Sequence, residues 1–197
     1  MIEIESFSGE AITPYLQEVA QLRISVFRDF PYLYDGDLAY ESRYLTAYAA
    51  SPRSVFVLAK EGGRVVGAAT GIPLEDEDAA FQTPFLGTSF AISRVFYFGE
   101  SVLLPAYRGQ GIGHRFFDAR EAHARQLGGF THTAFAAVDR APDDPRTPKD
   151  YRSNEPFWTK RGYVRQPEMT MWLAWKELGE TEESHKPLTF RVRELLD

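Results

Sequence analysis

The segment PAYRGQGIGHRFF, residues 105–117, places three glycines at alternate positions immediately before a helical pattern. Glycine gives up side-chain packing and raises the entropy cost of ordering the chain, so its repeated use indicates that bare backbone is needed there. The first N–H groups of a helix have no acceptor within the helix, and the helix dipole favours negative charge beside them. The segment is therefore typical of an anion site, with phosphate as the expected group.

Related phosphate loops fit this segment less well. It lacks the lysine and hydroxyl residue of a nucleotide-triphosphatase loop, and GQGIGH has the spacing G-x-G-x-G in place of the dinucleotide pattern G-x-G-x-x-G. It also follows the fourth predicted strand, whereas a dinucleotide fingerprint usually follows the first.

Composition excludes several other classes of function. A formal net charge of -6 argues against broad nucleic-acid binding, and the lack of cysteine excludes disulfides, thiolate metal sites and cysteine nucleophiles. The first residues lack the basic start and apolar run of a signal peptide, and no eighteen-residue apolar stretch is present. We expect one cytoplasmic domain with no metal, no nucleic-acid partner and no membrane contact.

Hydrophobic periodicity predicts a mixed α/β chain around these residues. Strands are predicted at residues 2–7, 54–60, 64–74, 94–105, 130–138, 163–175 and 188–195. Helices are predicted from a Thr13 cap and Pro14 to about residue 30, and at 38–51, 112–127 and 151–162. Residues 75–93 have no sustained period and are predicted to be an insertion or loop; residues 139–150 form a proline-rich loop.

The glycine segment and the end of the last predicted helix resemble those of a known family. VLLPAYRGQGIG looks like the acetyl-CoA-binding segment of the GNAT N-acetyltransferase superfamily, whose signature is Arg/Gln-x-x-Gly-x-Gly/Ala after a strand that ends in proline. Arg108, Gly111 and Gly113 fill the signature positions, and Pro105 ends the strand. The later FWTKRGY resembles the end of the family's fourth helix. The order of predicted elements matches the family from the N-terminus to about residue 175.

The resemblance implies a fold and a domain organisation. We expect one acetyltransferase domain over residues 1–197, with a mixed, mostly antiparallel sheet of six to seven strands flanked by about four helices. Residues 1–175 would form the family core, and 176–197 a C-terminal loop and final strand. Because that tail could pair or swap with a second chain, a homodimer is possible.

The resemblance also implies a site for acetyl-CoA, the co-substrate. Backbone N–H groups from Arg108 to Gly113 would hold the pyrophosphate, and the backbone of Leu103 and Leu104 would pair with the pantetheine arm as an added strand does. The expected contacts are Leu103, Leu104, Arg108, Gly109, Gln110, Gly111, Ile112 and Gly113, joined by Asn154 and Trp158 near the last helix. For Asn154, a helix cap is an equal alternative.

The implied reaction is direct attack of a primary amine on the thioester in a ternary complex. It needs a neutral amine, an oxyanion donor near Leu103 or Leu104, and a proton source for the thiolate. Glu100 is the candidate base, because it is a lone carboxylate in an apolar strand shortly before the thioester position. The alternative is a structural glutamate held by an arginine such as Arg94.

The general acid is where the sequence departs from the family. Trp158 occupies the usual tyrosine position, and its indole N–H is not an acid of useful strength. Tyr151 and Tyr97 are possible substitutes; otherwise water serves. This departure keeps a second hypothesis open, a CoA or acyl-carrier binding module without catalysis. A purely structural α/β domain is the third.

The acceptor is expected to be a small-molecule or peptide amine. The aromatic run 30–37 lies between the first two helices, where Tyr32, Tyr34 and Asp35 would suit a cationic amine. Core packing and a turn explain the same residues. The acidic run 75–78 could add to the field at that site, although a solvated loop explains it as well.

Overall fold

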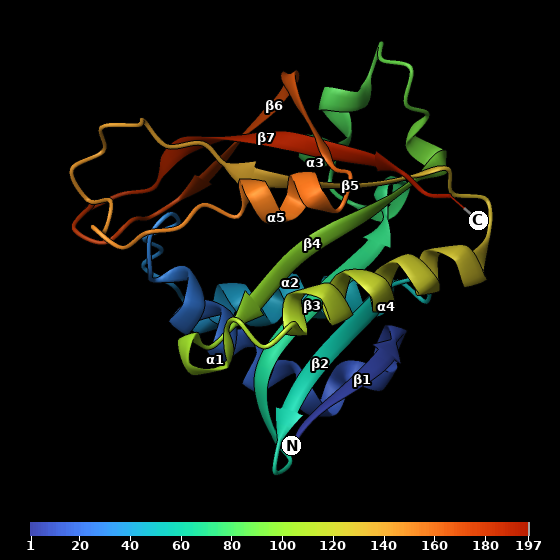
Figure 1. Ribbon diagram of the computed structural model, residues 1–197, viewed down its shortest axis with the longest axis horizontal. Coiled ribbons are helices and arrows are strands. Elements are labelled where there is room, and N and C mark those ends of the chain that lie inside the picture. Colours follow the sequence, from blue (N-terminus) through green and yellow to red (C-terminus); the bar gives the residue numbers. More distant parts are fainter. Residues whose placement is uncertain (197) are drawn as a thin grey trace.

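The computed structural model describes residues 1–196 of the chain. One seven-stranded sheet runs through it in the order β1-β2-β3-β4-β5-β7-β6 (Figure 1). Every neighbouring pair is antiparallel except β4 and β5, which are parallel. The strands span Ile2–Ser8 (β1), Val55–Glu61 (β2), Arg64–Pro73 (β3), Val95–Leu103 (β4), His132–Val138 (β5), Val164–Trp175 (β6) and Ser184–Glu194 (β7).

Helices cover both faces of this sheet and enclose two apolar cores. One core packs beneath α1 and α2, and the other packs beneath α4 and α5. Figure 1 shows α4 crossing β2 and β3 and α5 below β7. The helices span Leu16–Phe27 (α1), Leu38–Ala50 (α2), Ala79–Gln82 (α3), Ile112–Leu127 (α4) and Glu155–Lys160 (α5).

The expected fold class is confirmed, and most elements lie where the pattern predicts them. The helix after the glycine segment runs from Ile112 to Leu127 as predicted. The last strand pairs on both β6 and β5 and so lies inside the sheet. Residues 184–194 are thus part of the sheet, and residues 176–183 form the loop before them.

Three predicted boundaries are wrong. The first helix begins at Leu16, because Thr13 and Pro14 lie inside a 3₁₀ turn at Gly9–Tyr15 (η1). The predicted helix at 151–162 is only Glu155–Lys160, since a proline-rich loop continues to its start. The last strand begins at Ser184, four residues early, because the Lys186 ammonium is bonded within the hairpin to Glu180 and to the Trp175 carbonyl.

The predicted insertion contains short helical turns in place of an irregular loop. It includes α3 and the 3₁₀ turns Leu74–Asp76 (η2), Thr83–Phe85 (η3) and Ile92–Arg94 (η4). Leu74 and Phe85 are buried in the core beneath α1 and α2. The insertion is thus packed against the same face of the sheet as those helices.

The two halves of the sheet separate between β4 and β5. These strands pair only from Val95 to Tyr97 on one side and from His132 to Ala134 on the other. Beyond that point β4 continues along β3 while β5 continues along β7. Because parallel strands run in one direction, the gap opens toward the C-terminal ends of both, where the glycine segment begins.

A β-bulge in β4 decides which side chains face the two cores. Gly71 pairs with Phe98, but Ala69 pairs with Ser101, so Gly99 and Glu100 together oppose one residue of β3. Strict alternation would direct Glu100 to the α4 face. The extra residue directs it instead to the face covered by α1 and α2, where it meets an arginine of α1.

Candidate active site

The glycine segment forms an open turn between β4 and α4. Pro105–Tyr107 is a 3₁₀ turn (η5), and Gly109 and Gly111 then adopt φ values of +76° and +77°. An added Cβ at either glycine would meet nothing within 4 Å, so the requirement is conformational and the turn is open to solvent. Gly113 has an ordinary helical conformation, and its Cβ would lie 3.5 Å from Phe157, an ordinary contact.

The turn presents a row of free backbone donors. In residues 1–196, no protein acceptor is assigned to the N–H groups of 109–113, and the bonds of α4 begin at His114, whose N–H donates to the Gly111 carbonyl. The Arg108 amide is different, because it donates to the Pro105 carbonyl at 3.1 Å. Its guanidinium folds back, and Nε donates to the Leu103 carbonyl at 3.2 Å. The donors for an anion are thus residues 109–113.

The end of β4 offers a free backbone edge beside this turn. The Leu104 N–H donates to the Val66 carbonyl at 3.0 Å, so it is committed to β3. Hydrogen-bonded and non-hydrogen-bonded pairs alternate along an antiparallel ladder, so the N–H of Leu103, which opposes Gly67, points away from β3. It points toward the gap that β5 leaves. Of the two expected oxyanion donors, Leu103 is available and Leu104 is not.

Glu100 is held from both faces of the sheet. Its carboxylate is 3% exposed, and Oε2 lies 2.6 Å from Nη1 of Arg23 on α1. From the other face, Arg120 of α4 donates to the Glu100 carbonyl at 3.0 Å and to the Thr70 carbonyl at 3.1 Å. Because of the bulge, these two carbonyls make no hydrogen bond between β3 and β4, and the buried Arg120 guanidinium donates to both instead.

Arg23 is shared between two carboxylates. It also pairs with Glu41 of α2, and its guanidinium lies 4.5 Å from the centre of the Tyr44 ring. Burial alone would lower the pKa of Arg23, but Glu100, Tyr44 and Glu41 raise it well above its ordinary value. The alternative that an arginine holds Glu100 agrees with this pair, but the arginine is Arg23 of α1 and not Arg94. No local pattern in β4 indicates a partner from α1.

Sequence reasoning missed Arg120, although its position carries a signal. It lies on the apolar face of α4, four residues after Phe116, and is fully buried over the rings of Phe98 and Phe117. Burial lowers the pKa of Arg120 to about 10. An arginine at a core position of a helix needs buried acceptors, and here the bulge supplies them.

The two candidate acids lie in different surroundings. Tyr97 is 2% exposed, and its ring packs against Phe81 and Phe190 on the same face as Glu100. Burial, with a further contribution from Glu77, raises the pKa of Tyr97 well above its ordinary value. Tyr151 is 38% exposed and lies in the loop before α5, with its ring edge-on to Phe30 at 4.7 Å.

Trp158 and Asn154 are placed by α5. Trp158 is half-buried, with its ring 5.0 Å from Phe135 and 5.2 Å from the guanidinium of Arg191. It fills space between the helix and the sheet. Asn154 precedes the helix at the N-cap position and is exposed, but its side chain makes no capping bond. The cap alternative for this side chain is therefore wrong, and its amide group makes no hydrogen bond within residues 1–196.

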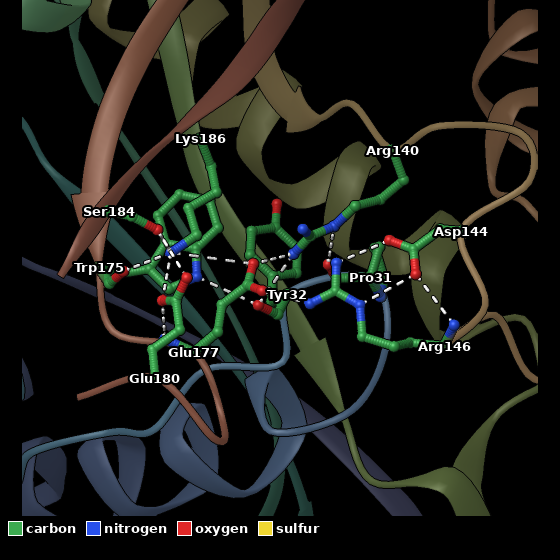
Figure 2. Close-up of polar contacts among 10 residues, drawn as sticks. All are labelled: Pro31, Tyr32, Arg140, Asp144, Arg146, Trp175, Glu177, Glu180, Ser184 and Lys186. Carbon is green, nitrogen blue, oxygen red and sulfur yellow. Dashed lines mark hydrogen bonds and ion pairs between the residues drawn. The ribbon is translucent and has the colours of Figure 1, made fainter. Parts of the chain in front are cut away.

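A buried network fixes the segment between α1 and α2, as Figure 2 shows. Arg140 donates to the carbonyls of Pro31 at 2.6 Å and Tyr32 at 3.2 Å, and it pairs with the buried carboxylate of Glu177. Arg146 pairs with the other oxygen of Glu177 at 2.6 Å. Sequence reasoning missed this network, because its members come from three loops.

Main-chain contacts also join the α1–α2 segment to the loop between β6 and β7. Tyr34 forms an antiparallel bridge with Glu177, and Leu178 N–H donates to the Leu33 carbonyl at 2.8 Å. Asp35 N–H donates to the Lys176 carbonyl at 2.9 Å, and the Lys176 ammonium pairs with the Asp35 carboxylate. Asp35 is therefore used structurally. The segment is bound to the β6–β7 hairpin.

A pocket of about 480 Å³ lies beside this network, at the end of β5. It is bounded by the α1–α2 segment, by the loop after β5 and by strands β6 and β7, and its wall includes Phe30, Pro31, Arg140, Tyr151 and Arg191. Tyr151 is part of this wall, whereas Glu100 and Tyr97 are not. The structure thus brings Tyr97 to the face of Glu100 and places Tyr151 elsewhere.

An open glycine turn at a helix start, a strand edge and a buried carboxylate on a bulge lie at a gap in a mixed sheet. This arrangement is the one expected of one class of protein, the acyl-CoA-dependent transferases. Comparison with known families assigns the chain within it. The profile of the acetyltransferase (GNAT) family matches residues 18–163, and the chain therefore belongs to that family. Its family makes it an acyltransferase.

Solved structures share the fold at low sequence identity. The Salmonella typhimurium protein yncA, solved with its cofactor acetyl-CoA, superposes with a TM-score of 0.59 at 12% identity, covering 100% of this chain and 95% of that one. An N-acetyltransferase from Staphylococcus aureus gives 0.61 at 11% identity, covering 98% and 99%. A ribosomal-protein-alanine N-acetyltransferase from Brucella melitensis gives 0.59 at 14% identity, covering 98% and 99%. A sequence search finds no match among curated proteins.

None of the helices in residues 1–196 has both the length and the apolar character needed to cross a bilayer.

Proposed function

We propose that the chain is an N-acetyltransferase that moves the acetyl group of acetyl-CoA to a primary amine by direct attack in a ternary complex. The observation that carries the proposal is the position of Glu100. A bulge directs this carboxylate to one face of the strand whose free edge would bind the pantetheine arm. A base and a thioester site on one strand suit acyl transfer to an acceptor that must lose a proton.

The residues present fit acetyl-CoA. The free amides of 109–113 and the dipole of α4 suit the pyrophosphate, and the edge at Leu103 suits an amide-bearing arm. Asn154, with no capping bond, and Trp158, at the adjoining helix, would complete the site. Bound there, acetyl-CoA supplies an activated acyl group.

In the proposed reaction the amine loses a proton to Glu100 and its nitrogen forms a bond to the acyl carbon, while the carbon–sulfur bond breaks. The Leu103 N–H would stabilise the oxygen that becomes negative. The thiolate then takes a proton. Tyr151 is the proposed donor, because it is partly exposed in the pocket wall on the β5 side of the gap, where solvent can replace its proton. Tyr97 is buried and holds its proton more tightly.

A binding module without catalysis is the second candidate. It is favoured by one observation, the use of Trp158 as a packing residue at the position where the family has its acid. The two candidates share the acetyl-CoA site and differ at Glu100. Acetyl-CoA binding distinguishes both candidates from a purely structural domain, which would not bind it.

Calorimetric titration with acetyl-CoA tests the site. Valine at position 111 would be strained at φ +77°. We therefore expect Gly111→Val to raise the Kd for acetyl-CoA at least tenfold, which corresponds to about 1.4 kcal/mol of binding free energy. Gly63→Val is the matched control, since Gly63 also has positive φ and open surroundings but lies in the β2–β3 turn. Equal affinity in all three proteins would exclude the glycine turn as the phosphate site.

Turnover of an amine panel tests the base. Glu100→Gln should lower kcat by about 10²–10⁴-fold with acetyl-CoA affinity unchanged, the range for loss of a general base. Glu41→Gln also alters a carboxylate that pairs with Arg23, and so controls for the loss of an ion pair. A glutamine variant at position 100 that turns over as fast as the parent would leave only the binding-module hypothesis.

A further inference from the structure

Unpaired polar atoms gather on one side of β4. In residues 1–196, six buried side-chain nitrogen or oxygen atoms have no hydrogen-bond partner within the protein. Four of them are Tyr48 Oη, Glu77 Oε1 and the two carboxylate oxygens of Glu100, although Glu100 Oε2 is 2.6 Å from Arg23. Buried polar groups are almost always paired, so a cluster of unpaired ones needs an explanation.

Tyr48 lies directly beside the bulge. A Cβ at Gly99 would be 2.7 Å from its hydroxyl oxygen and 2.5 Å from Thr70 Oγ1, so glycine is what admits the hydroxyl next to Glu100. Tyr48 is 3% exposed and comes from α2. Its hydroxyl is thus aimed at the strand that carries the proposed base.

Glu77 reaches the same place from the insertion between β3 and β4. One carboxylate oxygen accepts from the Asp78 N–H at 3.0 Å, which leaves Oε1 free. Gln82 fixes the turn by donating to the Glu77 carbonyl at 2.6 Å. Burial raises the pKa of Glu77, the nearby Tyr48 hydroxyl lowers it in part, and the charge of Glu100 adds to the rise.

The balance of charge on this face is negative. Three carboxylates, Glu41, Glu77 and Glu100, lie on this face, and the Arg23 guanidinium pairs with two of them, Glu41 and Glu100. Arg120 comes from the opposite face, where its bonds go to main-chain oxygens and Ser101. Asp78 adds negative charge beside Glu77, and the Tyr34 hydroxyl interacts with Glu41. Burial raises the pKa of three further tyrosines on this face well above ordinary values, so they stay neutral: Tyr44, Tyr48 and Tyr97.

Aromatic rings surround the carboxylates. Tyr44 and Tyr48 are 5.3 Å apart between ring centres, and Tyr97 is 5.3 Å from Phe81 of the insertion. The faces of aromatic rings attract cations, as Tyr44 already does with Arg23. Carboxylates among aromatic rings form a surface that suits a positively charged nitrogen.

We propose that Glu77 and Tyr48 complete, with Glu100, the binding site for the protonated amine of the acceptor, and that the acceptor is an aliphatic primary ammonium without a neighbouring carboxylate. A primary ammonium has three N–H donors, and the site offers three acceptor oxygens, Glu77 Oε1, Glu100 Oε1 and Tyr48 Oη. The Tyr48 hydroxyl hydrogen points toward Glu77, which leaves the lone pairs of Tyr48 Oη to accept. The inference rests on the proposed function, because Glu100 then takes one of those protons: an N–H bond breaks, an O–H bond forms and the amine becomes neutral. The nitrogen loses a second proton to solvent as the amide forms, and this balances the proton that Tyr151 gives to the thiolate and regains from solvent.

This charge balance also defines which amines are excluded. A carboxylate next to the amine, as in an α-amino acid, would meet Glu77 and Glu100 in a buried site where like charges repel strongly. An amine with three alkyl groups offers one N–H donor and would leave two acceptors unpaired. The insertion at residues 74–94 thus acquires a role in selecting the acceptor.

Equilibrium binding of ethylammonium to the CoA-saturated protein, followed by NMR, tests the site without turnover. We expect Glu77→Gln to weaken binding at least tenfold and Tyr48→Phe severalfold, with CoA affinity unchanged in both. Glu75→Gln is the matched control, because Glu75 is two residues away and pairs with exposed Arg53. Glycine should not bind. Equal ethylammonium affinity in the parent and Glu77→Gln, or glycine binding as tight as ethylammonium binding, would overturn the proposal.

Thermal unfolding tests whether Glu77→Gln folds and whether the Glu77 carboxylate is an unpaired charge in the parent. Since burial raises the pKa of Glu77 in the folded state, its stabilising contribution is present below the ordinary value of 4.5 and is lost as pH rises through the folded value. Glu77→Gln should therefore unfold at a higher temperature than the parent at pH 8 and at the same temperature at pH 4. No difference at either pH would mean that Glu77 carries no unpaired charge, against the proposal.

The binding and turnover results distinguish failure of the acceptor site from failure of the proposed N-acetyltransferase function. If acetyl-CoA binds and Glu100→Gln loses turnover while Glu77→Gln binds and turns over ethylamine normally, only the acceptor site is wrong. If acetyl-CoA does not bind, or Glu100→Gln keeps full turnover, the proposed function itself is wrong.

Discussion

Arg23 supplies the counter-ion of the candidate base, Glu100. Its guanidinium pairs with Glu100 and Glu41, and all three side chains are less than a tenth exposed. A buried ion pair adds little stability over a well-packed apolar replacement of both partners, but removal of one partner leaves uncompensated buried charge. The arginine is therefore needed to keep two carboxylates inside the protein.

We predict that Arg23→Met lowers the free energy of unfolding by about 3–5 kcal/mol, because Glu100 and Glu41 would remain buried without their cation. Urea unfolding measures it. Arg53→Met is the matched control: Arg53 also pairs with two carboxylates, Glu75 and Asp76, but is 40% exposed, so we expect a loss of about 1 kcal/mol or less. Similar losses in both variants would contradict the assignment of Arg23 as a structural counter-ion.

At the scale of elements, the loops around the gap are fixed by one buried carboxylate. Glu177 is 2% exposed and lies between Arg140 and Arg146, with Lys186 at 4.0 Å. Through Arg140 it holds the carbonyls of the α1–α2 segment, as Figure 2 shows. One wall of the pocket is thus preorganised by an ion-pair network in which each buried charge has a partner.

We predict that Glu177→Gln releases the α1–α2 segment from the β6–β7 hairpin, because Arg140 and Arg146 would lose their shared partner. Hydrogen exchange should become at least tenfold faster at the amides of Leu178 and Asp35, which bridge the two segments. Glu183→Gln, in the same hairpin loop but exposed, should leave both rates unchanged. Unchanged exchange in Glu177→Gln would show that the main-chain bridge holds without the network.

At the scale of the whole molecule, the sheet consists of two parts that diverge after a short parallel contact. The β1–β4 part carries the glycine turn and Glu100, and the β5–β7–β6 part carries the pocket wall. A ligand in the gap would contact both parts. Binding to the folded state alone raises its stability by mass action.

We predict that acetyl-CoA at 100 times its Kd stabilises the fold by about 2.7 kcal/mol and raises Tm by about 5–10 °C, given ~2–4 °C per kcal/mol for a chain of this length. Thermal unfolding with and without ligand measures the shift. Gly63→Val should show the same increment as the parent, and Gly111→Val a smaller one. An equal increment in all three proteins would place the ligand elsewhere.

The sequence by itself determined the class of fold, the glycine turn and the helix at Ile112–Leu127, because these depend on local periodicity and on backbone freedom at positions such as Gly111. It also indicated Glu100, as a lone carboxylate in an apolar strand. Only the tertiary structure decided the face to which Glu100 points, because a bulge opposite Thr70 breaks strict alternation. Its partner, Arg23, and its neighbours, Tyr48 and Glu77, come from elements 23 to 77 residues distant in sequence, and long-range packing leaves no local pattern to read.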